Sequence, residues 1–159
     1  MADEIKIVWE GLKEFSNELG GMNKELEKNL KKAMNDYLEL AEEGAKALVH
    51  RDEGELEERL TAKKPRKEED RIIGEIGTNL EYAFRRHEEP YRYGVHDKYD
   101  RGVLKEGYYV DGRGRRTRDK PNWRGEKPGR KYLERAIILT EDDFEKIMAD
   151  ALERTLGGR

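Results

Sequence analysis

Val49-His50-Arg51-Asp52-Glu53-Gly54-Glu55-Leu56 is the stretch that decides the fold, because the spacing of apolar residues changes across it. Upstream, from about Leu12 to Val49, apolar residues recur every three or four positions, as they do on one face of a helix. Downstream the spacing becomes two, which is typical of strands. The sequence therefore predicts a long amphipathic helix followed by a β-hairpin.

The hairpin is expected at about residues 55–77. Apolar residues alternate with polar ones over residues 55–62, and two isoleucines share one side of the run 71–77. Residues 63–70 between these runs are charged and contain one proline, which suits an exposed connection. The helix is expected to pack on the small antiparallel sheet that these strands form.

The N-terminal part should supply one more strand. Apolar residues alternate from Ile5 to Trp9, and this run ends at Gly11. The pair Gly20-Gly21 predicts a kink or break in the helix, so its continuous part should begin at Asn23, which is placed to cap it. Residues 81–89 are expected to form a short helix or strand.

A C-terminal helix is predicted after Thr140, which is placed to cap it. Leu139 can pack on Phe144 as a hydrophobic staple. An apolar stripe then runs along the helix to Leu152, and Gly157-Gly158 ends it. For the preceding residues, 131–139, helical spacing is present but the structure is left open.

Residues 91–130 lack periodicity and are rich in glycine. They are expected to form a long irregular basic loop with one strand candidate, Tyr108 to Val110, and loops of this length are usually functional or disordered. The fold class is thus α+β: a long N-terminal amphipathic helix, a small antiparallel sheet, a long irregular basic loop and a C-terminal helix. Residues 1–159 should form a single domain that carries this insertion.

Composition points to assembly with further copies of the chain. Hydrophobic residues make up 35% of the sequence and charged residues 43%, so a lone globule of this size would be marginal. The net charge of −3 hides a division, because the segment 98–131 carries 12 Lys and Arg against 5 Asp and Glu. A basic segment on an acidic body can lie on the acidic surface of the next copy, or it can meet a phosphate backbone.

The sequence gives no sign of an enzyme. It has no cysteine, its three histidines stand in separate contexts, and its carboxylate pairs lie among other charges. Metal sites need converging ligands, and acid–base catalysis needs two carboxylates in unlike environments. We therefore expect no catalytic residue, no cofactor and no metal site, with the histidines at the surface or in loops. No run reaches the roughly 18 apolar residues of a membrane span, so a membrane is not an expected partner.

Residues 113–131, called the basic loop below, are the strongest candidate for binding. Their Lys and Arg side chains are interleaved with or flanked by aromatic ones, a composition found where cations meet phosphates and rings stack on bases. Docking on a neighbouring subunit explains the composition equally well, and we favour it because the acidic body would repel nucleic acid. The candidate residues for contact with DNA or with another subunit are Arg113, Arg115, Arg116, Arg118, Trp123 and Arg124.

Four short matches, in order along the chain, resemble the siphophage neck and tail-component family. They are Trp9 to Phe15, a strand followed by a glycine-leucine entry to the helix; Asp52 to Leu56, where members carry Asp-Thr-Gly-x-Leu; Glu81 to Glu88, with its Tyr-Ala pair; and Pro128 to Ala136, similar to Pro-Phe-Leu-x-x-Ala. Glu53 stands in place of the usual threonine, no proline precedes Asp52, and the basic insertion has no counterpart.

The resemblance implies a structural virion protein rather than an enzyme. It implies a homomeric ring of six or twelve copies at the head–tail junction, around the DNA channel, where it helps to join the DNA-filled head to the tail. Its partners would be adjacent head-closure or connector proteins and tail-terminator or tail-tube proteins. Localisation would be the neck of the virion, after assembly in the bacterial host cytoplasm.

The subunit interface is expected to include Asp52, Gly54 and Leu56 at the turn, with Tyr82 and Glu88 near the ring surface. Two alternatives stay open at this point. One is a tail-terminator ring protein, and the other is a nucleic-acid-binding module that uses the basic loop.

Overall fold

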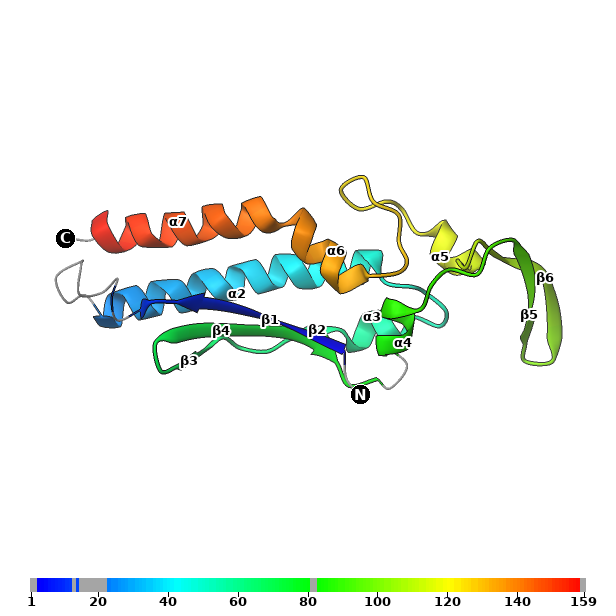
Figure 1. Ribbon diagram of the computed structural model, residues 1–159, viewed down its shortest axis with the longest axis horizontal. Coiled ribbons are helices and arrows are strands. Elements are labelled where there is room, and N and C mark those ends of the chain that lie inside the picture. Colours follow the sequence, from blue (N-terminus) through cyan, green and yellow to red (C-terminus); the bar gives the residue numbers. More distant parts are fainter. Residues whose placement is uncertain (1–2, 13, 15–22, 81–82, 158–159) are drawn as a thin grey trace.

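The computed structural model describes residues 3–12, 14, 23–80 and 83–157. Figure 1 shows an elongated α+β fold with the C-terminus at one end and a two-stranded hairpin at the other. In chain order the elements are β1 (Asp3–Glu10), α2 (Asn23–Leu48), α3 (Glu55–Arg59), β2 (Thr61–Ala62), β3 (Arg66–Glu68), β4 (Arg71–Thr78), α4 (Ala83–Glu88), β5 (Val95–Asp100), β6 (Val103–Val110), α5 (Arg115–Asp119), α6 (Tyr132–Leu139) and α7 (Glu141–Gly157).

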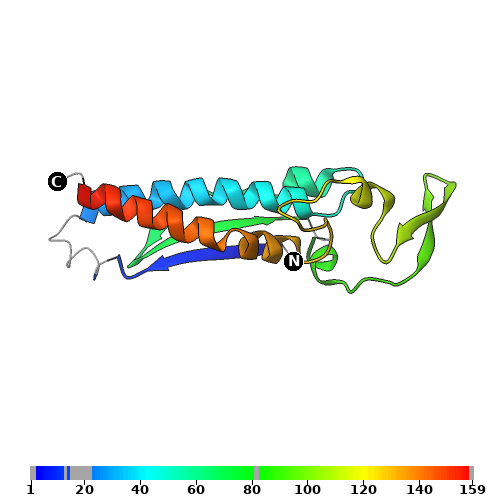
Figure 2. The same cartoon turned by 90° about the horizontal axis from the view of Figure 1, so that it is seen from above.

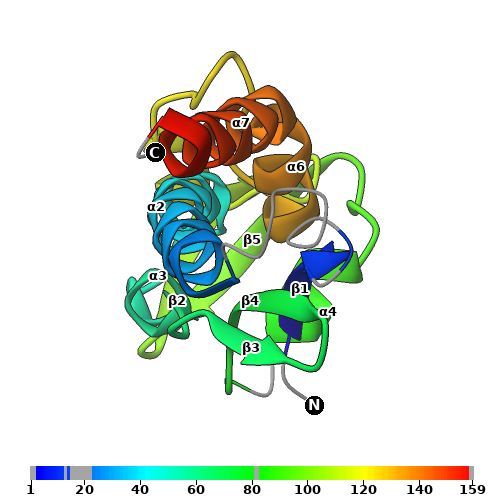
Figure 3. The ribbon, with the colours of Figure 1, turned by 90° about the vertical axis from the view of Figure 1, so that its left-hand side faces the viewer.

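Helix α2 lies between helix α7 and the sheet, as the end-on view in Figure 3 shows. Its apolar stripe packs in both directions. Leu30 and Met34 belong to one buried cluster with Ile72 of β4 and with Met148 and Ala151 of α7. The apolar face of the helix that the sequence predicts is thus buried within the chain.

Strand β4 is the centre of the larger sheet. β1 pairs with it antiparallel over its whole length, from Asp3 opposite Thr78 to Glu10 opposite Arg71, while β2 and β3 pair with the other edge. Gly74 lets α2 approach this strand closely, because a Cβ there would lie 2.9 Å from the Met34 Sδ. Any larger residue at this position would push helix and sheet apart.

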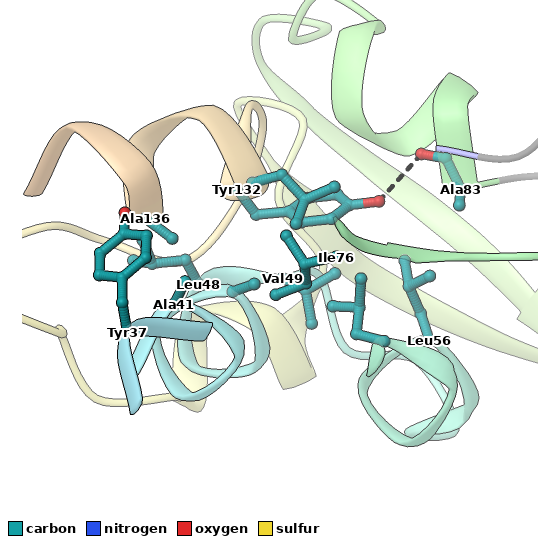
Figure 4. Packing of buried hydrophobic residues seen from close by; sticks show 12 residues of the cluster. Tyr37, Ala41, Leu48, Val49, Leu56, Ile76, Ala83, Tyr132 and Ala136 are labelled. Atoms are coloured by element: carbon teal, nitrogen blue, oxygen red, sulfur yellow. Dashed lines mark hydrogen bonds between the residues drawn. The ribbon is translucent and has the colours of Figure 1, made fainter. Parts of the chain in front are cut away.

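A second buried cluster joins α2 to α3, α4 and α6 (Figure 4). Tyr132 is fully buried there, and its hydroxyl donates to the Ala83 carbonyl at 3.1 Å. Tyr37 packs edge-on against Phe144, with ring centroids 4.9 Å apart. Its hydroxyl lies 2.9 Å from the Thr140 hydroxyl, which itself donates to a carbonyl of α6. The buried hydroxyls of Tyr37, Tyr132 and Thr140 therefore each have a partner, as burial requires.

The structure confirms the opening strand, the long helix from Asn23, the strand at 71–78 and the C-terminal helix. The expected break at Gly20-Gly21 lies outside the described residues. One detail of the C-terminal helix is wrong: the Thr140 side chain does not cap α7, because its hydroxyl bonds to carbonyls of α6 and to Tyr37. Residues 81–89 and 131–139, left open above, contain helices α4 and α6.

The first half of the predicted hairpin is also wrong. Residues 55–59 form helix α3, and only Thr61–Ala62 extend as a strand. Leu56 and Leu60 are four positions apart, a spacing that fits a helical turn as well as alternate positions of a strand. Both are buried in the same cluster. The connection 63–70 is correspondingly shorter than expected, because residues 66–68 pair with β4 as β3.

The expectation of irregular backbone over residues 91–130 is wrong for β5, α5 and residues 103–107 of β6, whereas the strand candidate Tyr108 to Val110 is confirmed as the last part of β6. β5 and β6 pair antiparallel around the two-residue turn Arg101-Gly102. Both turn residues have positive φ, 52° and 80°, as in the type I′ turns that suit the twist of a hairpin. We call the β5–β6 hairpin the arm; it projects away from the helices and the larger sheet (Figures 1 and 2).

Candidate assembly interface

The junction loop, residues 50–54, connects α2 to α3 and lies at the base of the arm. Gly54 has a φ of 87°, a left-handed conformation that glycine adopts without strain. Its carbonyl accepts a hydrogen bond from the Glu58 amide at 3.1 Å, so it forms the start of α3. Leu56, two residues on, is only 4% exposed and belongs to the chain's own core.

Asp52 of the junction loop holds the arm. Its carboxylate lies 2.6 Å from the Lys98 ammonium on β5, and its carbonyl accepts a hydrogen bond from Arg116. Burial opposes the charged form of Lys98, but the bond to Asp52 outweighs it and raises the pKa of Lys98. Lys98 also lies 4.7 Å from the Tyr108 ring centroid, within cation–π range. The ion pair thus joins the arm to the junction loop, and the cation–π contact holds Lys98 within the arm.

Lys120 of the basic loop is buried at the C-terminal end of α2. Its ammonium donates to the Lys46 and Val49 carbonyls at 2.8 and 2.7 Å and lies 2.7 Å from the Glu57 carboxylate. A cation at this end of a helix meets the unpaired carbonyls and the negative end of the dipole. Burial lowers the pKa of Lys120, and the pair with Glu57 acts against that shift. Burial also acts to raise the pKa of Glu57, but hydrogen bonds from Arg51 and Lys120 outweigh it and lower the pKa.

The arginines of the basic loop also bind within the chain. Arg113 donates to the Pro128 carbonyl at 3.0 Å, and Arg118 donates to the Tyr108 carbonyl at 2.8 Å. Arg124 lies 2.6 Å from the Asp143 carboxylate at the start of α7, and this bond lowers the pKa of Asp143. Arg115 makes the loosest of these contacts, 3.4 Å from its guanidinium to the Glu106 carbonyl. Much of the positive charge seen in the sequence therefore holds the loop against its own chain.

Trp123 is packed on helix α2 at Gly44. A Cβ at Gly44 would lie 2.5 Å from Cη2 of the indole, which explains a glycine in the interior of a long helix. Arg124 covers the same ring at 4.9 Å from its centroid. Because the ring is partly buried in this way, it lacks the free faces of a base-stacking platform.

Glu88 binds next to α6. Its carboxylate lies 2.6 Å from the Lys131 ammonium and 2.9 Å from Nδ1 of His87, and these bonds, with Lys131 first, lower its pKa. His87 is 5% exposed and packs edge-on against Tyr132. The expectation of a surface histidine is therefore wrong for His87, because its ring fills a place beside the core. Tyr82, the other residue expected here, lies outside the described residues.

A cavity of about 580 Å³ lies between the junction loop, the end of α4 and the base of the arm. His50, His96 and Tyr108 are among its lining residues. Within the described part of the chain, His50 Nδ1 and the Tyr108 hydroxyl are buried without a hydrogen-bond partner. Burial, assisted by the nearby charge of Arg86 and other cations, lowers the pKa of His50 to about 3.

The apolar surface of the arm is a feature that sequence reasoning missed. On the arm, Tyr99 is 74% exposed, Val95 65% and Val103 56%, and Tyr93, just before β5, is 85% exposed. Exposed apolar patches mark interaction sites. The signal in the sequence was the recurrence of valine, leucine and tyrosine within a segment otherwise rich in glycine and charge.

Two further observations concern metal ions and membranes. In the described ranges, no group of three or more histidine and acidic side chains lies close enough to hold a metal ion. Among the helices that the structure describes, none has the length and apolar character needed to cross a bilayer.

Comparison with known proteins gives one match. Residues 12–85 fit the family described as "Bacteriophage HK97-gp10, putative tail-component". This segment contains α2, the junction loop and β2 to β4, but neither the arm nor the basic loop. A search of curated proteins and a search of solved structures found no match. Over residues 12–85 the chain is thus similar to the HK97-gp10-like family of phage tail components, which confirms the resemblance predicted from the sequence.

Proposed function

We propose that this protein is a structural component of a tailed-phage virion that forms a homomeric ring of six or twelve copies at the head–tail junction. The observation that carries the proposal is the match of residues 12–85 to a phage tail-component family. The ring would surround the DNA channel and help to join the filled head to the tail, beside connector and tail-terminator or tail-tube proteins.

The geometry supports a structural role for the predicted interface residues. Asp52 and Gly54 shape the junction loop, and Asp52 fixes the base of an arm that exposes apolar side chains. Glu88 ties the end of α4 to α6 through Lys131. In the proposed ring these residues set the direction of surfaces that meet the neighbouring subunit.

Intramolecular use of the basic loop favours this role over a free nucleic-acid-binding module. Arg113, Arg118 and Arg124 donate to groups of their own chain, and Trp123 packs on α2. Affinity for DNA depends on cations that are free to replace counterions. We expect weak binding to duplex or single-stranded DNA with little dependence on salt; tight binding that falls steeply from 50 to 200 mM salt would favour the module instead.

Electron microscopy of particles made with and without this protein tests the proposal. A phage with a stop codon in this gene should yield DNA-filled heads and separate tails, and supply of the protein in trans should restore joined particles. A tagged copy should be located at the collar. Joined, infectious particles formed in normal numbers without the protein would refute the proposal.

A further inference from the structure

The tip of the arm is an apolar surface without a cover from the described part of its own chain. Tyr99 lies directly opposite Leu104 on one face of the hairpin, and Val103, opposite Asp100, lies next to the turn on the other face. These three side chains are 74%, 42% and 56% exposed. A two-stranded hairpin on its own is marginally stable in water, so this surface gains most when another molecule covers it.

Cations border this apolar tip. Arg101 occupies the turn, its side chain is 84% exposed, and its guanidinium lies 3.5 Å from the Glu53 carboxylate. Lys105 is exposed on β6, next to Leu104. A partner that suits the tip therefore offers an apolar centre with acidic groups around it.

The same chain carries such a surface elsewhere. Ile138 is 61% exposed on α6, whereas Leu133 and Ala136 of that helix are buried. Four exposed acidic residues lie within about two turns of Ile138 along α6 and α7. We call Ile138 and these residues the shoulder; the acidic ones are Glu141, Asp142, Glu145 and Glu134, the last of which lies 3.5 Å from the Lys131 ammonium.

We propose that the arm tip of one copy packs on the shoulder of the next copy. Tyr99 and Leu104, which share one face of the hairpin, would cover Ile138. Arg101 at the turn and the exposed Lys105 near it would meet the acids of the shoulder. The inference rests on the proposed function in one respect, that copies of this chain assemble with one another. It adds which two surfaces meet.

Arm and shoulder are different surfaces, so the contact is head-to-tail. Each copy gives its arm to one neighbour and receives an arm from the other. Contacts of this kind close into a ring when the rotation between neighbours divides a full turn. The arm projects away from the rest of the chain (Figures 1 and 2), as an element that reaches a neighbour must.

Cysteine pairing tests the contact directly, because the chain has no cysteine of its own. A Val103→Cys variant and an Ile138→Cys variant are mixed and treated with a short thiol-to-thiol crosslinker. We expect a crosslinked species of twice the protomer mass, formed much more from the mixture than from either variant alone. The matched control pairs Val103→Cys with Val8→Cys, because Val8 is an exposed apolar residue on β1 that is not part of the shoulder.

Charge reversal gives a second readout that does not depend on crosslinking. Arg101→Glu with Lys105→Glu should weaken self-association at least tenfold in mass photometry, and Glu141→Lys with Asp142→Lys should do the same. A mixture of the two double variants should recover mixed oligomers, because one arm and one shoulder are then complementary again. Glu153→Lys on α7, exposed and outside the shoulder, serves as the control and should leave the oligomer unchanged. Far-ultraviolet circular dichroism and thermal melting establish that each variant is folded.

The outcomes separate this inference from the proposed function. If the unmodified protein assembles but Val103→Cys links to Val8→Cys as well as to Ile138→Cys, the arm–shoulder contact is wrong and the ring proposal stands. If charge reversal leaves assembly unchanged, the contact is again wrong. If the unmodified protein stays monomeric at all concentrations, both the self-association in the proposed function and this contact are refuted.

Discussion

Replacing Lys120 by methionine should strongly destabilise the fold. The substitution keeps the length and apolar stem of the side chain but removes an ammonium that is 6% exposed and binds three oxygens at 2.7 to 2.8 Å. Breaking a buried ion pair from one side costs about 3–5 kcal/mol. Glu57 keeps its second partner, Arg51, at 2.9 Å, so we expect about 3 kcal/mol, at the low end of that range.

Urea unfolding of wild type and variant measures this loss. For a chain of 159 residues, about 3 kcal/mol corresponds to a fall in Tm of roughly 6–12 °C. Lys127→Met, an exposed lysine in the same loop, is the matched control and should lie within about 0.5 kcal/mol of wild type. If Lys120→Met is as stable as Lys127→Met, the ammonium is not the group that holds the loop to the end of α2. A double-mutant cycle with Glu57→Gln then separates the ion pair from the two carbonyl contacts.

Three further changes have expected signs. The pKa of His50 is lowered to about 3, so between about pH 6.5 and pH 3 the unfolded chain takes up a proton that the folded chain does not, and the free energy of unfolding should fall as the pH drops through this range. His50→Gln should reduce the slope of unfolding free energy against pH, measured in urea titrations, by up to about 1.4 kcal/mol per pH unit. An unchanged slope would count against burial of His50. Hydrogen bonding, first from Arg66, lowers the pKa of Glu75 to about 2. The ionised Glu75 side chain therefore stabilises the fold fully above the unfolded pKa of about 4.3, and this stabilisation is lost as the pH falls through about 2. The difference in unfolding free energy between wild type and Glu75→Gln should shrink over that interval, and a constant difference would contradict the pairing. Gly44→Ala should destabilise the protein in thermal melts, because the added Cβ would lie 2.5 Å from the Trp123 ring, although alanine is about 1 kcal/mol better than glycine in a helix. In a Trp123→Ala background the same substitution should stabilise the protein. An equal effect in both backgrounds would exclude the clash.

Periodicity predicted the parts of the fold that have one buried face. Helices α2 and α7 bury an apolar stripe, and β4 buries Ile72 and Ile76, so the spacing of apolar residues recorded their structure directly. The run 55–62 failed because Leu56 and Leu60 fit either period. Only the packing of both leucines into one cluster selected the helix.

The spacing of apolar residues could not predict the structure of the arm or of the basic loop, and the causes are physical. β5 alternates between exposed and half-buried residues, but its half-buried positions are His96, Lys98 and Asp100, so the spacing of apolar residues does not mark it. The place of Lys120 depends on carbonyls more than seventy positions away in the sequence, and nothing in the local charge pattern distinguishes it from the exposed Lys127. The division of charge between the basic loop and the acidic body was visible in the sequence. It was not visible that part of this charge is paired within one chain.

The ion pair between Asp52 and Lys98 fixes the hairpin to the junction loop that follows α2, so the hairpin can tilt about this point. From Lys98 to Arg101 the chain extends about 10 Å at roughly 3.3 Å per residue, so a tilt of about 10° at this ion pair displaces the turn by about 2 Å. A single carboxylate thereby governs where Tyr99 and Val103 come to rest. A small movement of this ion pair therefore shifts the exposed side chains beside the turn.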